Sequence, residues 1–172
     1  MRKGYTQVYT GSGKGKTTAA FGCALRAAGC GLRVCVIQFM KNKPSGELRG
    51  LSALPQVTIK QFGAGPVVRK ESLSEDDYKC AREGLSCAGE ALCGKEYGLV
   101  VLDEINIAVH MGLLKKEDLL ELIKNRPAET ELIITGRYAD PAVIEVADLV
   151  TEMTQVKHYY DKGVEAREGV EY

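Results

Sequence analysis

The 172 residues suit one domain with a single core, and a hydrophobic content of 45% is typical of a packed globule rather than a disordered chain. Lys plus Arg (23) balance Asp plus Glu (23), so the composition gives no sign of a basic surface for nucleic acid. No apolar run approaches the roughly 20 residues of a membrane helix, and the first residues lack the apolar core of a signal peptide, so we expect a cytoplasmic protein that binds neither membrane nor nucleic acid.

The first third of the chain predicts a strand, a Gly-rich loop, a helix and a second strand. The β-prone segment TQVYT, Thr6–Thr10, forms the first strand. The helix begins at Lys16 and ends near Gly29. Residues 33–39, RVCVIQF, have the apolar character of a buried strand. The expected apolar face of the helix consists of Phe21, Ala24, Leu25 and Ala28.

The middle of the chain predicts a loop, a weaker strand and a long helix. Residues 41–50 are rich in Lys, Pro and Gly and are expected to form a loop, and the strand follows at Val57–Phe62. The Gly-Ala-Gly-Pro segment 63–66 ends that strand. Ser74 is the predicted N-cap of the helix, because three acidic residues follow it in the first turn. The core stripe of the helix is expected to be Ala81, Leu85, Ala88 and Leu92.

The last third continues the alternation of strands and helices. The expected segments are a strand at 97–104, a helix at 116–125, a strand at 131–136, a helix at 141–147, a strand at 148–153 and a polar tail from 154 to 172. Such alternation is typical of a mainly parallel sheet with helices on both faces. We predict an α/β protein with one domain over residues 1–172, and ligands at the carboxyl ends of the strands.

The six cysteines are spaced as small core residues rather than as metal ligands. None forms a Cys-x-x-Cys pair, and the two histidines stand far from any ligand spacing. In a reducing cytoplasm we expect free and mostly buried thiols. A structural zinc site is therefore not predicted.

The segment between the first strand and the first helix has the features of a phosphate loop. Gly15-Lys16-Thr17 matches the second half of the pattern G-x-x-x-x-G-K-[ST], although Thr10 stands where the first Gly is expected. Glycines allow backbone N–H groups to turn toward an anion at the helix N-terminus. The alternative is a Gly/Lys turn without function. The loop, its strand and its helix together predict a phosphate-loop NTPase-like (RecA-like) fold. The predicted ATP-binding residues of the loop are Gly11, Ser12, Gly13, Lys14, Gly15, Lys16, Thr17 and Thr18.

Two adjacent acids follow the most strand-like segment of the chain. Asp103 and Glu104 come after Leu-Val-Val-Leu, and an acid at the end of a parallel strand beside a phosphate loop commonly holds Mg²⁺. The alternative is that these acids cap a helix or lie solvated at a strand end. The residues alone do not distinguish which carboxylate touches the metal.

Five motifs in order carry a resemblance over nearly the whole chain. They are T-G-x-G-K-G-K-T-T, V-I-Q-F-x-K, L-D-E, I-T-G-R and the ending V-K-H…G-V-x-A-x-x-G-V-E-Y. At this spacing the chain resembles the phosphate-loop type (CobA/CobO/BtuR type) of the ATP:cob(I)alamin (corrinoid) adenosyltransferase family. In that family T-G rather than G opens the loop, so that Thr10 fits the pattern.

The resemblance implies an enzyme that transfers the 5′-deoxyadenosyl group of ATP to the cobalt(I) of a reduced corrinoid, with release of tripolyphosphate, in cobalamin biosynthesis or salvage. It implies Mg²⁺ as cofactor, ATP as co-substrate, a cobalt-reducing flavoprotein as electron donor and a homodimer. Some members carry an N-terminal extension that helps to cover the site. Here three residues precede Gly4, so the resemblance leaves open how the site is closed.

The resemblance also implies roles for individual residues. Lys16 and Glu104 are expected to be catalytic, and Thr17 and Glu104 to bind the metal with Asp103 in support. Lys41 and Arg137 are candidates to contact ATP, with a solvated surface charge as the alternative for each. Phe62 is the aromatic residue nearest to the segment that handles the lower face of the corrinoid in some members; the alternative is a core residue.

Two other functions stay open from the sequence. One is a phosphate-loop kinase or NTPase that cleaves the γ-phosphoryl group, with Arg137 as an arginine finger. The other is an ATP-gated corrinoid carrier without turnover. The phosphate product separates the first alternative from adenosyl transfer, and turnover under strong reduction separates the second.

Overall fold

Six parallel strands form one sheet at the centre of the protein. The computed structural model describes residues 3–65 and 70–171. The strands lie in the spatial order β3-β2-β4-β5-β1-β6, and every neighbouring pair is parallel. Their bounds are Thr6–Thr10 (β1), Val34–Phe39 (β2), Val57–Phe62 (β3), Leu99–Asp103 (β4), Glu131–Thr135 (β5) and Leu149–Glu152 (β6).

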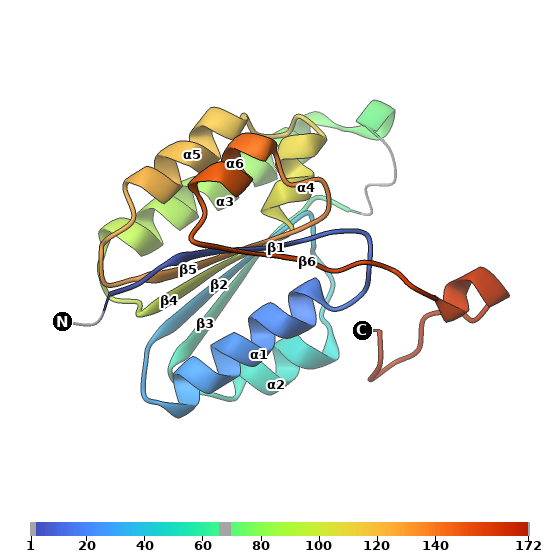
Figure 1. Ribbon diagram of the computed structural model, residues 1–172, viewed down its shortest axis with the longest axis horizontal. Coiled ribbons are helices and arrows are strands. Elements are labelled where there is room, and N and C mark those ends of the chain that lie inside the picture. Colours follow the sequence, from blue (N-terminus) through green and yellow to red (C-terminus); the bar gives the residue numbers. More distant parts are fainter. Residues whose placement is uncertain (1–2, 66–69, 172) are drawn as a thin grey trace.

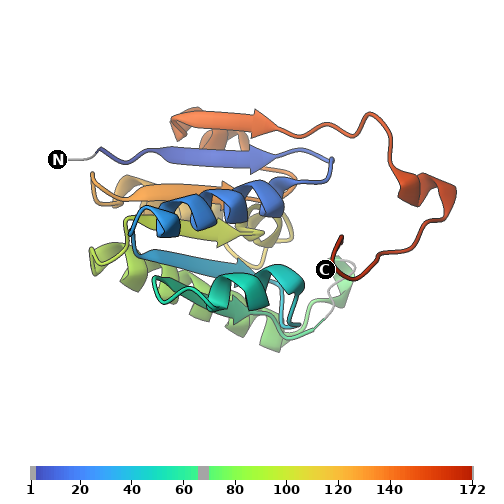
Figure 2. The same cartoon turned by 90° about the horizontal axis from the view of Figure 1, so that it is seen from below.

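Helices cover both faces of this sheet (Figure 1). On one face lie α1 (Lys16–Gly29) and α2 (Gly46–Ser52). On the other lie α3 (Glu75–Cys93), α4 (Ile105–His110), α5 (Lys116–Lys124) and α6 (Pro141–Val146). Two 3₁₀ turns, η1 (Lys70–Ser72) and η2 (Tyr159–Lys162), complete the elements of the described ranges. Figure 2 shows the strands pointing toward one end of the molecule, where the chain after β6 passes the sheet and folds back. The α/β prediction, with helices on both faces, is confirmed.

The sheet separates two hydrophobic cores, and alternate residues of one strand face different cores. In β2, Cys35, Ile37 and Phe39 belong to the core under α3 and α5. Val34 and Val36 of the same strand belong to the core under α1 and α2. Because both faces of a parallel sheet are buried, its central strands consist mainly of apolar residues. This explains why β2 and β4 stand out in the sequence as continuous apolar runs.

Most predicted elements agree with the structure. The strands Thr6–Thr10 and Val57–Phe62 have the expected bounds. The observed bounds of the other predicted strands and helices differ from the expected ones by at most two residues. Ser74 caps α3 in a capping box: its Oγ accepts from the Asp77 N–H at 3.3 Å, and Asp77 accepts from the Ser74 N–H at 2.9 Å. These elements are well marked in the sequence because their patterns are local.

Part of the segment predicted as a loop at 41–50 is helical. The helix α2 spans Gly46–Ser52, and its Leu48 and Leu51 are buried in the core under α1. Two glycines and a length of two turns give this segment a weak intrinsic helix propensity. Burial of the two leucines stabilises the helix, which is a tertiary effect that the local pattern did not reveal.

Two further details differ from the sequence predictions. A short helix, α4 (Ile105–His110), directly follows β4, where none was expected. Leu25, predicted on the apolar face of α1, is 55% exposed. It follows the buried Ala24 by about 100° of helix rotation and so lies off the buried face. The other three predicted residues are buried, together with Ala20.

The cysteines are free but not mostly buried. Cys35 and Cys87 lie in the core under α3, whereas Cys30 and Cys93 are exposed at the ends of α1 and α3. The expectation of buried thiols therefore fails for the residues at helix ends. In the part of the chain that the structure describes, no helix combines the length and the apolar character that a membrane crossing requires.

We expect a thiol reagent such as iodoacetamide to modify Cys30 and Cys93 first and Cys35 last. Burial raises the pKa of the Cys35 thiol to about 12, so almost no reactive thiolate is present at neutral pH. Mass spectrometry of timed samples measures the order. Unfolded protein, in which all thiols should react at similar rates, is the control, and early modification of Cys35 in native protein would contradict its buried position.

Candidate active site

The loop between β1 and α1 is folded tightly enough to cradle an anion. Gly11 (φ 94°) and Gly15 (φ 122°) adopt left-handed conformations that favour glycine. A Cβ on Gly11 would lie 2.5 Å from the Met153 carbonyl oxygen, so only glycine fits there. Gly11 thus supplies the flexibility that Thr10 cannot, one residue later than in the usual pattern. The Thr10 hydroxyl instead accepts from the Ala139 N–H at 3.4 Å.

The ammonium group of Lys16 lies inside this loop. Its Nζ donates to the carbonyl oxygens of Gly11 at 2.8 Å and Gly13 at 2.7 Å, and the residue is only 7% exposed. Burial lowers the pKa of Lys16, while the nearby Glu104 carboxylate opposes that shift. The ammonium is therefore held where phosphate oxygens can replace the two carbonyl oxygens as acceptors.

The carboxylate of Asp103 is fully buried and accepts four hydrogen bonds. Thr17 (2.9 Å) and Thr135 (2.7 Å) donate their hydroxyls to Oδ1. Gln38 (2.8 Å) and Lys41 (3.0 Å) donate to Oδ2. Both oxygens are thus engaged, and Asp103 orients Thr17 and Lys41 rather than facing the cavity. The sequence predicted Asp103, Thr17 and Lys41 for this region but gave no role to Gln38 or Thr135, which stand inside quoted motifs.

Glu104 has a different environment from its neighbour. It adopts a left-handed conformation (φ 63°) between β4 and α4, and its N–H donates to the Thr135 hydroxyl at 3.0 Å. Burial, and then the Asp103 charge, raises the pKa of Glu104, while Lys41, Lys16 and Arg137 oppose the shift. Although Glu104 is the N-cap residue of α4, its side chain makes no capping hydrogen bond. Its carboxylate lines the cavity described below.

The oxygen donors at this point suit a magnesium ion. Mg²⁺ usually binds one or two carboxylates, with phosphate oxygens and water completing the shell. Glu104 and the Thr17 hydroxyl offer such donors beside the phosphate loop. In the described ranges, no cluster of three or more His, Cys, Asp or Glu residues forms a ready metal site. Because Glu104 and Thr17 leave positions for phosphate oxygens and water, the residues present fit an ion that arrives with a nucleotide.

Lys41 and Arg137 both lie at the site. Lys41 forms an ion pair with Asp103 at 3.0 Å. Burial alone would lower the pKa of Lys41, but the Asp103 charge outweighs that effect and raises it. Arg137 is exposed, lines the cavity and lies close enough to influence the pKa of both Lys16 and Glu104. Both cations thus face the region where a triphosphate would lie.

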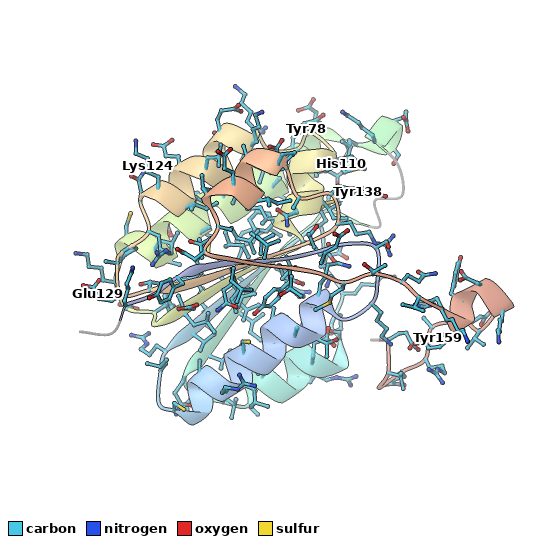
Figure 3. All side chains as sticks on the ribbon, viewed as in Figure 1. Tyr78, His110, Lys124, Glu129, Tyr138 and Tyr159 are labelled. Carbon is cyan, nitrogen blue, oxygen red and sulfur yellow. The ribbon has the colours of Figure 1, made fainter. Side chains whose placement is uncertain are left out.

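A cavity of about 1400 Å³ opens at the carboxyl ends of the strands. One side of it is formed by the phosphate loop and Glu104, and another by α4 and the segment after β5. The third side is the tail, which we define as residues 154–171. Figure 3 shows His110 and Tyr138 on one side of this region and Tyr159 of the tail on another. Seven of the eight predicted loop residues, all but Gly11, line the cavity, together with Lys41, Glu104 and Arg137.

The tail is attached to the phosphate loop through Lys14. The Lys14 Nζ donates to Glu171 Oε1 at 2.6 Å, to the Tyr159 hydroxyl at 2.9 Å and to the Val170 carbonyl at 3.0 Å. Tyr159 also donates to Glu171. The pKa of Glu171 is held far below its usual range, first by Arg167 and then by Lys14. The Lys14 side chain therefore contacts the tail, and the sequence prediction gave no role to Tyr159 or Glu171.

Phe62 lies at the end of β3 and packs against the core under α3, beside Phe39 and Gly84. Phe62 is not among the described residues that line the cavity. Its expected contact with a corrinoid stays a prediction. Residues 66–69 of the neighbouring segment, including the Pro66 expected to help end the strand, lie outside the described residues.

Comparison with known proteins gives consistent matches over the whole chain. A family model described as ATP:corrinoid adenosyltransferase BtuR/CobO/CobP matches residues 2–172. A protein of Pseudomonas aeruginosa named corrinoid adenosyltransferase is 40% identical over 172 residues, which covers 99% of this chain and 84% of the relative. One of Escherichia coli K12 with the same name is 38% identical (99% and 86% covered). Corrinoid adenosyltransferase CobA of Salmonella typhimurium is 36% identical (99% and 86% covered).

Replacement of Asp103 by Asn should lower the free energy of unfolding by about 2–3 kcal/mol. The new amide group is a donor where the carboxylate accepted donors, and the ion pair with Lys41 is lost. Urea denaturation measures the change. The control is Asp76→Asn in the exposed first turn of α3, where we expect less than about 1 kcal/mol. Equal effects of the two substitutions would contradict the structural role of Asp103.

Replacement of Glu171 by Gln should release the tail while the melting temperature stays nearly unchanged. The amide lacks the charge that Lys14 and Arg167 contact, and exposed ion pairs contribute little to global stability. Limited proteolysis with trypsin should cleave the tail several-fold faster. The matched control is Glu168→Gln, since among the described residues the ion pair of Glu168 is with the exposed Arg49, at 3.5 Å. If both variants are cleaved at the wild-type rate, the anchoring role of Glu171 is wrong.

Proposed function

The chain belongs to the ATP:corrinoid adenosyltransferase family, and we propose that this enzyme transfers the 5′-deoxyadenosyl group of ATP to the cobalt(I) of a reduced corrinoid, releasing tripolyphosphate. The observation that carries the proposal is the cavity, which joins a phosphate loop to a space larger than a nucleotide needs. Pockets for single small ligands measure about 300–1000 Å³, and this cavity measures about 1400 Å³. The cavity therefore exceeds the range for one small ligand, which supports the proposal that a second reactant meets ATP there.

The proposed adenosyl transfer requires no proton transfer by the protein. The electron pair of cobalt(I) attacks the 5′ carbon of ATP and forms the cobalt–carbon bond. The bond between that carbon and the triphosphate oxygen breaks, and its electron pair leaves with tripolyphosphate. Cobalt becomes formally cobalt(III). Because cobalt(I) is itself a strong nucleophile, no general base is needed to create it. The protein must position two reactants and stabilise the charge on the leaving group.

Lys16, Arg137 and the loop N–H groups supply that stabilisation. When a triphosphate enters, we expect the Lys16 ammonium to exchange the carbonyl oxygens of Gly11 and Gly13 for phosphate oxygens. The tail partly encloses the cavity that Lys16 lines, so the contact between the ammonium group and a phosphate is screened less there than in water. Lys41 is held by Asp103 at the same edge and can contact a phosphate oxygen with little movement.

Glu104 and Thr17 would hold the magnesium ion that accompanies ATP. The Thr17 hydroxyl donates to Asp103 in the structure, which leaves its oxygen lone pairs directed away from that carboxylate. When bound, the ion would neutralise part of the charge that develops on the departing triphosphate. Glu104 lies among Lys16, Lys41 and Arg137, so its negative charge balances these cations until the nucleotide binds.

The wider context of the reaction follows from the resemblance. We place the enzyme in the cytoplasm, in cobalamin biosynthesis or salvage, with a cobalt-reducing flavoprotein as the source of the electron and with a homodimer as its assembly. The edge strand β6, with the exposed apolar side chains of Leu149 and Val150, is a candidate site of self-association.

An anaerobic assay with ATP and chemically reduced hydroxocobalamin tests the proposal. We expect a cobalt–carbon bond, seen in the corrinoid spectrum, and one tripolyphosphate per adenosyl group. Lys16→Ala should reduce the rate below detection, and Glu104→Gln should lower it by about 100-fold, because each removes stabilisation of the leaving group. Lys124→Ala, on the exposed face of α5, is the control and should leave the rate unchanged.

The products also separate the alternative functions. Orthophosphate without adenosylation would overturn the proposal in favour of a kinase or NTPase. Binding of both ligands without turnover under strong reduction would favour an ATP-gated corrinoid carrier instead.

A further inference from the structure

Two aromatic side chains from distant parts of the sequence stack at the cavity. His110 is the last residue of α4, and Tyr138 lies in the segment between β5 and α6. Their ring centroids are 4.2 Å apart and the ring planes differ by 24°. Both side chains line the cavity, and Figure 3 shows them next to each other. We call this pair the aromatic wall.

The backbone of Tyr138 is strained for a residue of its size. Its φ of 60° lies in the left-handed region, which bulky residues rarely adopt and which glycine adopts without cost. The side chain does not recover that cost by burial, because Tyr138 is 61% exposed. Strained positions of this kind concentrate at binding and catalytic sites. The geometry therefore suggests that the ring is placed for a ligand rather than for the stability of the fold.

The two sides of the cavity differ in charge. The side formed by the phosphate loop carries Lys16 and Glu104 and suits a triphosphate with its metal ion. Arg137, from the segment after β5, lies close enough to influence the pKa of both groups. The aromatic wall is extended by Ile107 and Met111, which also line the cavity. These four side chains include no carboxylate, ammonium or guanidinium group. They suit the face of a wide, flat ring system such as a corrin macrocycle.

We propose that Tyr138, held by its stack on His110, is a contact surface for the corrin macrocycle and helps to place cobalt against the 5′ carbon of ATP. The inference rests on the proposed function and specifies where its second substrate binds. Tyr138 touches the substrate, whereas His110 acts by positioning the tyrosine ring. The charged side of the cavity and the aromatic wall thus bind different reactants.

The strain at Tyr138 allows a sharp test. Tyr138→Gly removes the ring and relieves the left-handed conformation, so the melting temperature should stay close to that of the wild type. Equilibrium dialysis with cob(II)alamin should show about tenfold weaker corrinoid binding, which corresponds to the loss of one stacking contact. ATP binding, measured by calorimetry without corrinoid, should be unchanged. The matched variant Tyr138→Phe keeps the ring and should bind the corrinoid like the wild type.

The role of His110 has its own measurement. His110→Ala should raise the KM for the corrinoid with little effect on the KM for ATP, and His110→Phe should restore the wild-type value because it rebuilds the stack. A substitution that acted only on stability would raise neither KM selectively.

The outcomes separate the inference from the proposed function. Unchanged corrinoid binding in Tyr138→Gly, in a protein whose wild type adenosylates the corrinoid, would overturn the inference alone. Weaker ATP binding in that variant would also overturn it, because the aromatic wall would then hold adenine. A wild type that neither binds nor adenosylates the corrinoid would overturn both.

Discussion

The buried carboxylate of Asp103 is the constraint on which the site depends. A charge without contact to water must be compensated by donors of fixed geometry, or folding becomes unfavourable. Here the donors come from α1, from β2, from Lys41 just after β2, and from β5. Since β2 and β5 are the two neighbours of β4 in the sheet, one carboxylate aligns three strand ends with the helix that carries the phosphate loop.

This arrangement divides the work between two adjacent acids. Asp103 is occupied by the protein itself, so Glu104 is the carboxylate that faces the cavity. The left-handed conformation of Glu104 ends β4 abruptly and starts α4, which carries His110 to the rim of the same cavity. A single backbone feature therefore sets both the charged and the aromatic sides of the site.

The sequence predicted what is local and missed what depends on distant contacts. The buried strands and the phosphate loop are continuous patterns, and they were found with nearly correct bounds. The helix α2 was missed because its stability comes from burial of Leu48 and Leu51 under α1. Gln38 stands inside a recognised motif, but nothing in the motif names Asp103 as its partner. Lys14 and Glu171 also stand inside recognised motifs, but the motifs do not reveal their contact, which joins opposite ends of the described chain.

The strand order has a consequence for how the protein folds. β1 lies between β5 and β6, so both of its partners come from the last third of the chain. The strand that precedes the phosphate loop therefore cannot enter the sheet until that part of the chain is available. Contacts of such long sequence separation form slowly, because a large loop must close before they stabilise anything. During refolding, secondary structure should therefore return before the capacity to bind nucleotide.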